Sequence, residues 1–206
     1  MISSEYAKRG FEYLYNINSI YNLESIFKYG LLSKNKANEY RIEYVDLSNH
    51  EVQSIRESTK IGDGVELHDY ASLYFNPRNA MLYYLMKNGY EQQICILEIS
   101  NTVLDYSDSF ISDGNAAKFG THFYSSKNGL YHLEYEKIFI ESWDDNDPYI
   151  KEEKKRHMFA EALVKNKVYQ DDIIKILVPN DIVKNKLLSM NLNIEISVNV
   201  HMFFGE

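Results

Sequence analysis

The chain has 206 residues, and its 22 basic and 30 acidic side chains give a formal net charge of −8. Hydrophobic residues make up 45% of the sequence, which is enough for a core, and the length suits one domain spanning residues 1–206. The acidic balance excludes a positive field over the whole surface, so it argues against tight non-specific binding to nucleic acid or anionic lipid.

The first third of the chain predicts a strand, a helix and a long polar segment. Period-two alternation indicates the strand, and apolar residues at helical spacing indicate the helix, with Ser19 or Asn22 as its cap. The expected elements are a strand over 12–18, a helix over 19–29 ended by Gly30, a mixed segment over 34–64, a helix near 51–58 within it, and a Gly-Asp-Gly turn at 62–64.

The remaining two thirds predict more strands than helices. In chain order we expect a strand over 71–76, a helix from about 78 to 86, a buried strand over 92–99, an irregular stretch near 101–150, strands over 159–165 and 173–178, a helix begun by Asn180 or Asp181, and a strand over 193–203. Because strands and helices do not alternate regularly, we predict an α+β fold on a small mixed sheet.

Several common kinds of site are missing from the sequence. Cys95 is the single cysteine and lies in an apolar run, so we expect a buried core thiol. The six histidines show no metal-binding spacing, so no metal site is expected. Glycine-rich phosphate loops and the GxSxG motif of serine hydrolases are also absent. No secretory signal and no run of about 20 apolar residues is found, so we expect a cytoplasmic protein without membrane contact.

The most informative residue is Glu161, which lies in the apolar string FAEALV. A carboxylate in a buried strand is costly unless it is paired or functional. Strand alternation would place Phe159, Glu161 and Leu163 on one face. The alternative is an edge strand from which Glu161 points into water.

Three other segments carry groups suited to binding. The basic run KKRH at 154–157 is either a solvated helix end or a phosphate site. In LYFNPRNAMLYY (73–84) the aromatic side chains beside Arg78 either form core or provide a stacking surface for bases. In YNINSIYNL (15–23) a strand meets a helix start, where the asparagines are either caps or ligand contacts.

Four blocks of the sequence, taken together and in this order, resemble the DarT family of DNA ADP-ribosyltransferase toxins. They are YNINSIYNLESIFKYGLL, HDYASLYFNPRNAMLY, DGNAAKFGTHFY and KKRHMFAEALV. The resemblance implies an ADP-ribosyltransferase-like split mixed β-sheet with flanking short helices, an NAD-binding cleft, and a long substrate-recognition loop near 101–150. It also implies transfer of ADP-ribose from NAD onto a base of single-stranded DNA, and a macrodomain antitoxin that removes it.

The resemblance assigns roles to individual residues. Glu161 falls on the family's catalytic glutamate, and Arg56 on an arginine that either clamps the NAD pyrophosphate or positions the acceptor base. The implied NAD-binding residues are Asn16, Ile17, Asn18, Asn22, Gly30, Leu31, Arg56 and Phe75. The implied substrate-binding residues are Tyr74, Arg78, Met81, Asn115 and Lys155.

The sequence departs from the family pattern at two positions. Asn16 replaces the usual histidine, and Phe159 replaces the usual glutamine two residues before the glutamate, a position implicated in substrate choice.

The leading hypothesis from the resemblance is a monomeric, metal-independent transferase that uses NAD to modify a base of single-stranded DNA, as a toxin or phage-defence effector. The alternatives are a transferase of the same fold that modifies RNA or protein, and an inactive module that binds NAD or nucleic acid.

Overall fold

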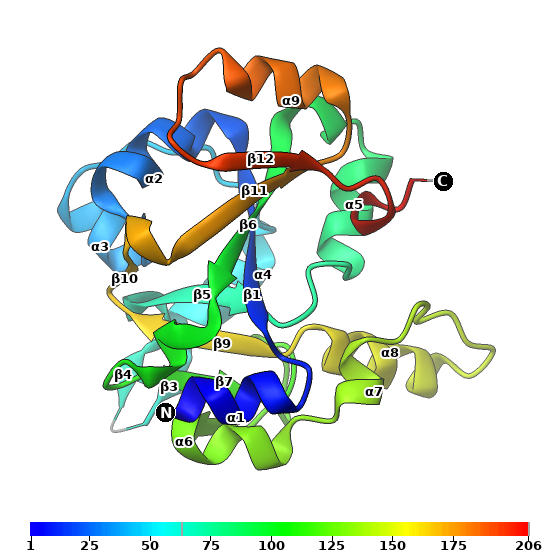
Figure 1. Cartoon of the computed structure of the whole chain (residues 1–206). Helices are drawn as coiled ribbons and strands as arrows, with labels where there is room; N and C mark the ends of the chain where they lie inside the picture. Colours follow the sequence, from blue (N-terminus) through cyan, green and yellow to red (C-terminus); the bar gives the residue numbers. More distant parts are fainter. Residues whose placement is uncertain (63, 206) are drawn as a thin grey trace.

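The computed structural model describes residues 1–62 and 64–205, which form an α+β fold around a mixed eight-stranded sheet (Figure 1). Strands β11 and β12 run parallel, and the other neighbouring pairs run antiparallel. Across the sheet the order is β12 (Glu195–Val198), β11 (Ile173–Val178), β6 (Ile94–Ser100), β1 (Tyr13–Ser19), β5 (Tyr70–Tyr74), β9 (Glu161–Lys165), β7 (Phe110–Ser112) and β8 (Phe123–Ser125).

The sheet is narrow at its centre. Strands β1 and β6 are paired along all seven residues of β1, from Tyr13 to Ser19, whereas β1 and β5 are in register only at Tyr15 and Tyr74. Two four-stranded halves therefore diverge from this point, and in Figure 1 β1 and β6 run steeply while β9 crosses below them.

Short helices surround the sheet and occupy both of its ends. The α-helices are α1 (Ile2–Lys8), α2 (Leu23–Tyr29), α3 (Lys34–Glu39), α4 (His50–Ser58), α5 (Ala80–Lys87), α6 (Ser126–Gly129), α7 (Tyr135–Ile138), α8 (Pro148–Met158) and α9 (Asp181–Leu188). The 3-10 helices are η1 (Ile20–Asn22), η2 (Leu67–Asp69), η3 (Glu91–Gln93), η4 (Asn101–Asp105), η5 (Leu130–His132), η6 (Gln170–Asp172) and η7 (His201–Phe203). Two small ribbons pair β2 (Leu31–Leu32) with β10 (Lys167–Val168), and β3 (Lys60–Ile61) with β4 (Val65–Glu66).

Strand β6 shows how the sequence forms a core on both faces of the sheet. Cys95, Leu97 and Ile99 belong to the large apolar cluster on one face, and Ile94 and Ile96 belong to the cluster on the other. Each of these side chains is fully buried. The prediction of a core thiol is thus confirmed, and burial raises the pKa of the Cys95 thiol to about 12.

Side chains of the helix-capping residues explain several helix starts. Ser19 accepts a hydrogen bond from the Tyr21 amide, and Asn180 accepts one from the Val183 amide, as expected for N-caps. The helix predicted over 19–29 is a 3-10 turn followed by α2, and Gly30 ends it with a φ of 91°. The strands expected over 12–18, 71–76, 92–99 and 173–178, and the helix near 51–58, are also found, with small shifts at their ends.

Other predictions need correction. The stretch near 101–150 is only partly irregular, because it contains the short elements β7, β8, α6 and α7. The last strand ends at Val198 rather than near 203, and residues 201–203 form η7. Phe159 is not in the strand, because α8 continues to Met158 and the Phe159 amide bonds to the Arg156 carbonyl. Asp63, at the centre of the predicted turn over 62–64, lies outside the described residues.

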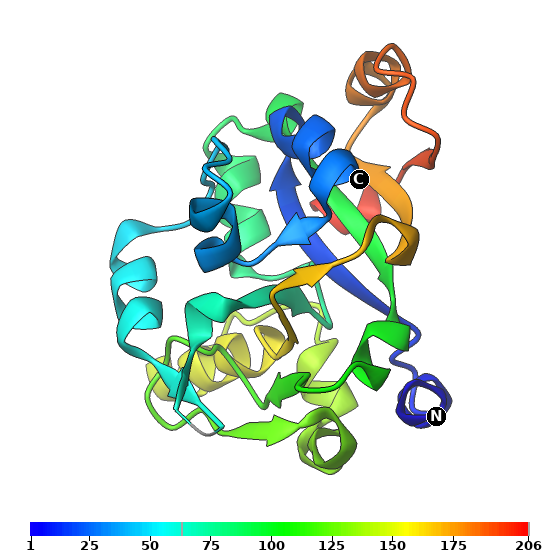
Figure 2. The same cartoon turned by 90° about the vertical axis from the view of Figure 1, so that its left-hand side faces the viewer.

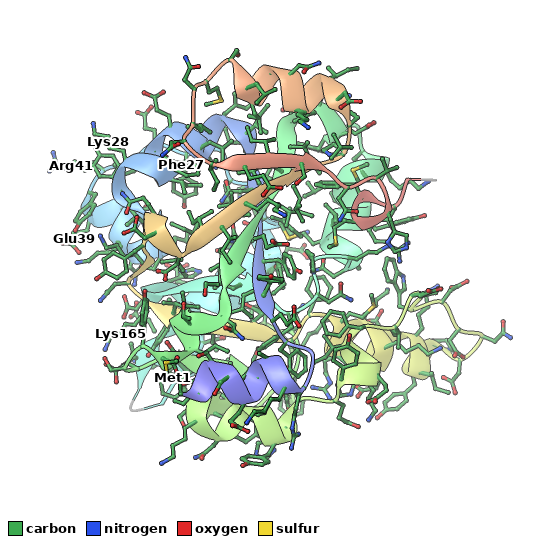
Figure 3. The ribbon with its side chains drawn as sticks, in the orientation of Figure 1. Met1, Phe27, Lys28, Glu39, Arg41 and Lys165 are labelled. Atoms are coloured by element: carbon green, nitrogen blue, oxygen red, sulfur yellow. The ribbon has the colours of Figure 1, made fainter. Side chains whose placement is uncertain are left out.

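Charged side chains project from the outer surfaces of the helices. Figure 3 labels Lys28, Glu39 and Arg41, which lie at the edge formed by α2 and α3 and are exposed. Within residues 1–62 and 64–205, no helix is long and apolar enough to cross a membrane.

Candidate active site

An ion pair between Arg56 and Glu161 forms the centre of the site. Nη1 of Arg56 lies 3.0 Å from Oε1 of Glu161, and Nη2 lies 3.1 Å from Oε2. Glu161 is 1% exposed and Arg56 9%. The alternative that Glu161 points into water from an edge strand is wrong, because β9 lies between β5 and β7. Two parallel hydrogen bonds to one carboxylate make a strong and geometrically specific contact.

Neighbouring polar groups fix both partners. The Ala116 amide donates to Oε1 of Glu161 over 3.1 Å, and Nη2 of Arg56 also donates to the Ser72 hydroxyl. The Glu161 amide donates to the Ser112 hydroxyl over 3.1 Å, which fixes the start of β9 against β7. Oε2 accepts only from Arg56 among these groups, so it can still accept a hydrogen bond from a ligand.

The charges of the pair alter the titration of nearby groups. Burial opposes the charge of Arg56, but the attraction of Glu161 and their hydrogen bonds raise the pKa of the guanidinium above its ordinary value. Burial, followed by the Glu161 charge, raises the pKa of the Tyr74 hydroxyl. Arg56 therefore stays protonated and Tyr74 stays neutral at physiological pH, so both can donate hydrogen bonds.

A cleft of about 920 Å³ opens beside this pair. One wall comes from β1, η1, α2 and β2, and the facing wall comes from residues 42–53 and α4. Figure 2 shows α4 in cyan at the left edge of the molecule, away from β1. Tyr74, Met81, Asn115 and Phe159 lie at the end of the cleft that holds Glu161. The rings of Tyr74 and Phe159 meet edge to face, with centroids 5.8 Å apart.

Most residues that the resemblance implicated line this cleft. They are Asn16, Ile17, Asn18, Asn22, Gly30, Leu31, Arg56, Tyr74, Met81, Asn115 and Glu161. The junction over 15–23 is therefore part of the cleft. Its asparagines also bond to the protein itself: Asn16 donates to the Ser72 carbonyl over 3.0 Å, and Asn18 donates to Asn16 over 2.9 Å.

The other three residues that the resemblance implicated, Phe75, Arg78 and Lys155, do not line this cleft. Phe75 is fully buried in the core, with its ring centroid 5.1 Å from that of Phe11. Arg78 donates to the carbonyls of Glu141 and His201, and its guanidinium lies 4.3 Å from the centroid of the Phe204 ring. Phe75 and Arg78 are thus not among the residues that line the cleft.

Lys155 lines a second hollow of about 270 Å³, which shares Asn115 and Phe159 with the main cleft. This hollow is also lined by Phe119, whose side chain is fully exposed. The Lys155 ammonium is 2.8 Å from Glu152. The basic run over 154–157 forms the last turns of α8, where its lysines and arginine pair with acidic side chains.

Several parts of the site have no recognisable pattern in the sequence. Ser72, Ser112 and the Ala116 amide contact Arg56 or Glu161, but isolated serines and a backbone amide leave no distinctive pattern. The wall formed by residues 42–49 was also missed, because it contains no helix or strand. No group of three metal-ligating side chains occurs in the part of the chain that the structure describes.

A family model described as "ssDNA thymidine ADP-ribosyltransferase, DarT" matches residues 15–204. The chain belongs to the DarT family. The resemblance in the four sequence blocks is thereby confirmed. A "DNA ADP-ribosyl transferase-DNA ADP-ribosyl glycohydrolase fusion protein" of Thermosipho africanus is 32% identical over 157 residues, which are 75% of this chain and 39% of the relative.

Solved structures agree with this DarT assignment. Thermosipho africanus DarTG in complex with ADP-ribose matches with a TM-score of 0.83 and 28% identity, over 94% of this chain and 51% of that one. Thermus sp. 2.9 DarT in complex with ADP-ribosylated ssDNA matches with a TM-score of 0.81 and 22% identity, over 94% and 96%. The same Thermus protein in complex with NAD+ gives 0.75 at 22% identity, over 93% and 96%. This chain thus spans about half or less of the Thermosipho proteins that it matches.

Proposed function

We propose that this chain transfers ADP-ribose from NAD to a thymine base of single-stranded DNA. The observation that best supports the proposal is the buried carboxylate of Glu161, held by Arg56 on both oxygens at one end of a large cleft. Membership of the DarT family supports the reaction class. A Thermus relative has been solved with ADP-ribosylated ssDNA and with NAD+, which supports both substrates.

The groups that line the cleft fit NAD. The cleft volume of about 920 Å³ lies within the roughly 300–1,000 Å³ that is usual for small-molecule sites. Asn16 and Asn18 each keep one amide N–H that is not used within the protein. The Lys34 ammonium bonds to Gln53 over 3.0 Å and keeps two further donors for a phosphate oxygen.

Glu161 can serve both halves of the transfer. When NAD is bound, breaking its C1′–nicotinamide bond releases neutral nicotinamide and develops positive charge on the ribose. The carboxylate of Glu161 stabilises that charge and can accept a hydrogen bond from a ribose hydroxyl through Oε2. Thymine N1 already carries deoxyribose, so N3 forms the new bond to C1′, and its proton leaves to Glu161 or to a water that Glu161 orients.

Arg56 acts at the same end of the cleft. Its terminal nitrogens bond to Glu161 and Ser72, which favours a role in holding the carboxylate and the acceptor base over a role in clamping the pyrophosphate. Tyr74 and Phe159 provide the aromatic wall beside it, where stacking is worth about 1–3 kcal/mol per base. A single strand suits this pocket, because presenting a base from a duplex first costs a few kcal/mol.

The test uses purified protein, NAD and a single-stranded oligonucleotide with one thymine. We expect the mass of one ADP-ribose to be added to this strand, with no addition to a matched strand that lacks thymine. Glu161→Gln should abolish the product. Modification of a uracil-containing RNA or of protein alone would favour the rival transferases, and NAD binding without nicotinamide release would favour an inactive binding module.

We further propose that a DNA ADP-ribosyl glycohydrolase, of the macrodomain class, is the antitoxin that removes the product. The Thermosipho relative carries a transferase and a glycohydrolase in one fusion protein. Incubating the modified oligonucleotide with such a glycohydrolase should return the strand to its original mass, and persistence of the adduct would reject this pairing.

A further inference from the structure

Three asparagines form a continuous hydrogen-bonded chain along one wall of the cleft. Asn18 donates to Oδ1 of Asn16 over 2.9 Å, and Asn22 donates to Oδ1 of Asn18 over 2.8 Å. At the inner end, Asn16 donates to the Ser72 carbonyl over 3.0 Å. At the outer end, Asn22 bonds to the backbone of Val45. The asparagine chain therefore connects β5 to the facing wall of the cleft.

Counting donors separates Asn22 from the other two asparagines. A side-chain amide has two N–H donors. Asn22 uses one for Asn18 and one for the Val45 carbonyl, over 2.8 and 2.9 Å, so neither remains for a ligand. Its Oδ1 accepts from the Val45 amide over 2.8 Å, and the residue is 7% exposed. Asn16 and Asn18 each keep one N–H, so direct contact with NAD is left to them.

The bonds from Asn22 are the polar attachment of the wall, and Leu47, which packs against the apolar cluster around Ile17, is its apolar one. Residues 43–48 lie between α3 and α4 and contain no helix or strand. Among the described residues, the hydrogen bonds that join these six positions to other parts of the chain are the two between Asn22 and Val45. Val45 itself is 42% exposed, so its own burial adds little and the two hydrogen bonds are what hold this position. Residues 43–48 all line the cleft except Glu43.

At both of its ends the asparagine chain contacts a segment that holds or carries Arg56. The wall over 43–48 runs into α4, which carries Arg56 near its end. Ser72, whose carbonyl accepts from Asn16, contacts Arg56 through its hydroxyl. A shift of the wall would therefore change mainly the width of the cleft, since Arg56 is itself held by its bonds to Glu161 and Ser72.

We propose that Asn22 is a positioning residue for the transfer. It fixes residues 43–48 as the wall against which NAD binds, and through Asn18 and Asn16 it keeps that wall in register with Arg56. This inference rests on the proposed use of NAD, but it assigns Asn22 no contact with NAD. It departs from the expectation that Asn22 binds NAD directly.

The test compares Asn22→Ala with Asn101→Ala as a matched control. Asn101 is 8% exposed and donates to the carbonyls of Ser3 and Phe11 over 3.0 and 2.9 Å, and it does not line the cleft. We expect Asn22→Ala to raise KM for NAD about tenfold, with kcat at saturating NAD lowered less than about threefold. Asn101→Ala should lower thermal stability while leaving KM for NAD unchanged.

A second measurement reports on the wall without the reaction. In hydrogen exchange without NAD, the Val45 amide should be protected in the wild type and in Asn101→Ala, and should lose protection in Asn22→Ala. Val45→Pro removes the amide N–H that donates to Oδ1 of Asn22. If Asn22→Ala does not fold, this variant should reproduce the rise in KM for NAD. Unchanged KM in either folded variant, or a Val45 amide unprotected in the wild type, overturns the proposal. A wild type that binds no NAD would overturn the proposed function, while the exchange data would still report on the wall.

Discussion

Arg56→Ala tests the energetic core of the site, because it leaves the Glu161 carboxylate buried without its counter-charge. Arg56 makes two hydrogen bonds to a carboxylate that is 1% exposed, and the Ala116 amide is the remaining donor. Removing one partner of a buried ion pair costs about 3–5 kcal/mol. For a chain of this size, about 2–4 °C of Tm is lost per kcal/mol, so we expect a drop of about 6–20 °C together with loss of transfer.

The double variant Arg56→Ala/Glu161→Gln separates charge from packing. Glutamine has nearly the shape of glutamate but no charge, so the cost of an unpaired buried carboxylate disappears. We expect the double variant to be about 1–3 kcal/mol more stable than Arg56→Ala alone, while remaining inactive. Chemical denaturation gives the free energies of unfolding, and mass analysis of the oligonucleotide gives activity. If Arg56→Ala is as stable as the wild type, or the double variant is no more stable than Arg56→Ala, the reasoning fails.

Three further changes test the surroundings of the pair. In Gly114→Ala the added Cβ would lie 2.9 Å from Cγ and 3.0 Å from the carbonyl oxygen of Arg156, so the loop that donates to the buried carboxylate must move, and kcat should fall about tenfold with little change in KM for NAD. Phe119→Ala should raise KM for the oligonucleotide about tenfold without affecting KM for NAD, whereas Tyr131→Ala, another exposed aromatic, should change neither. Burial, followed by nearby positive charges, lowers the pKa of His68 from 6.5, so protonation of this residue favours the unfolded state. The free energy of unfolding should therefore fall as pH decreases below about 6.5. His68→Gln should flatten this fall in a series of denaturation curves measured at different pH values.

Local pattern was sufficient for the elements with regular periodicity. Strand β6 alternates between two apolar clusters, and α4 and α9 follow asparagine caps, so their positions could be predicted from neighbours in sequence. Glu161 was identifiable for the same reason, since a charge in an apolar string departs from the strand pattern. Its burial depends on β9 lying between β5 and β7, which is a property of strand order and not of local sequence.

Contacts between distant segments were beyond sequence pattern. Arg56 and Glu161 are 105 residues apart, and only the family resemblance assigned both of them to one site. Arg78 stands among aromatic neighbours in sequence, but its hydrogen bonds come from distant segments, since its guanidinium donates to the carbonyls of Glu141 and His201. The order of residues shows which groups are neighbours along the chain, whereas tertiary packing determines which of them remain available to a ligand.

The distribution of charge bears on the proposed action of this acidic chain on DNA. The basic run over 154–157 lies beside the site, but Lys154, Lys155 and Arg156 pair with acidic side chains at 2.8, 2.8 and 3.3 Å. Such pairing leaves little net field to attract phosphates, and with a net charge of −8 the chain has no general attraction to make up for it. In the proposed function, affinity for a single strand would come mainly from base contacts with the aromatic wall of Tyr74 and Phe159, a mode of binding that releases few counterions. Because few phosphates would be neutralised in the proposed complex, added salt should weaken substrate binding only modestly.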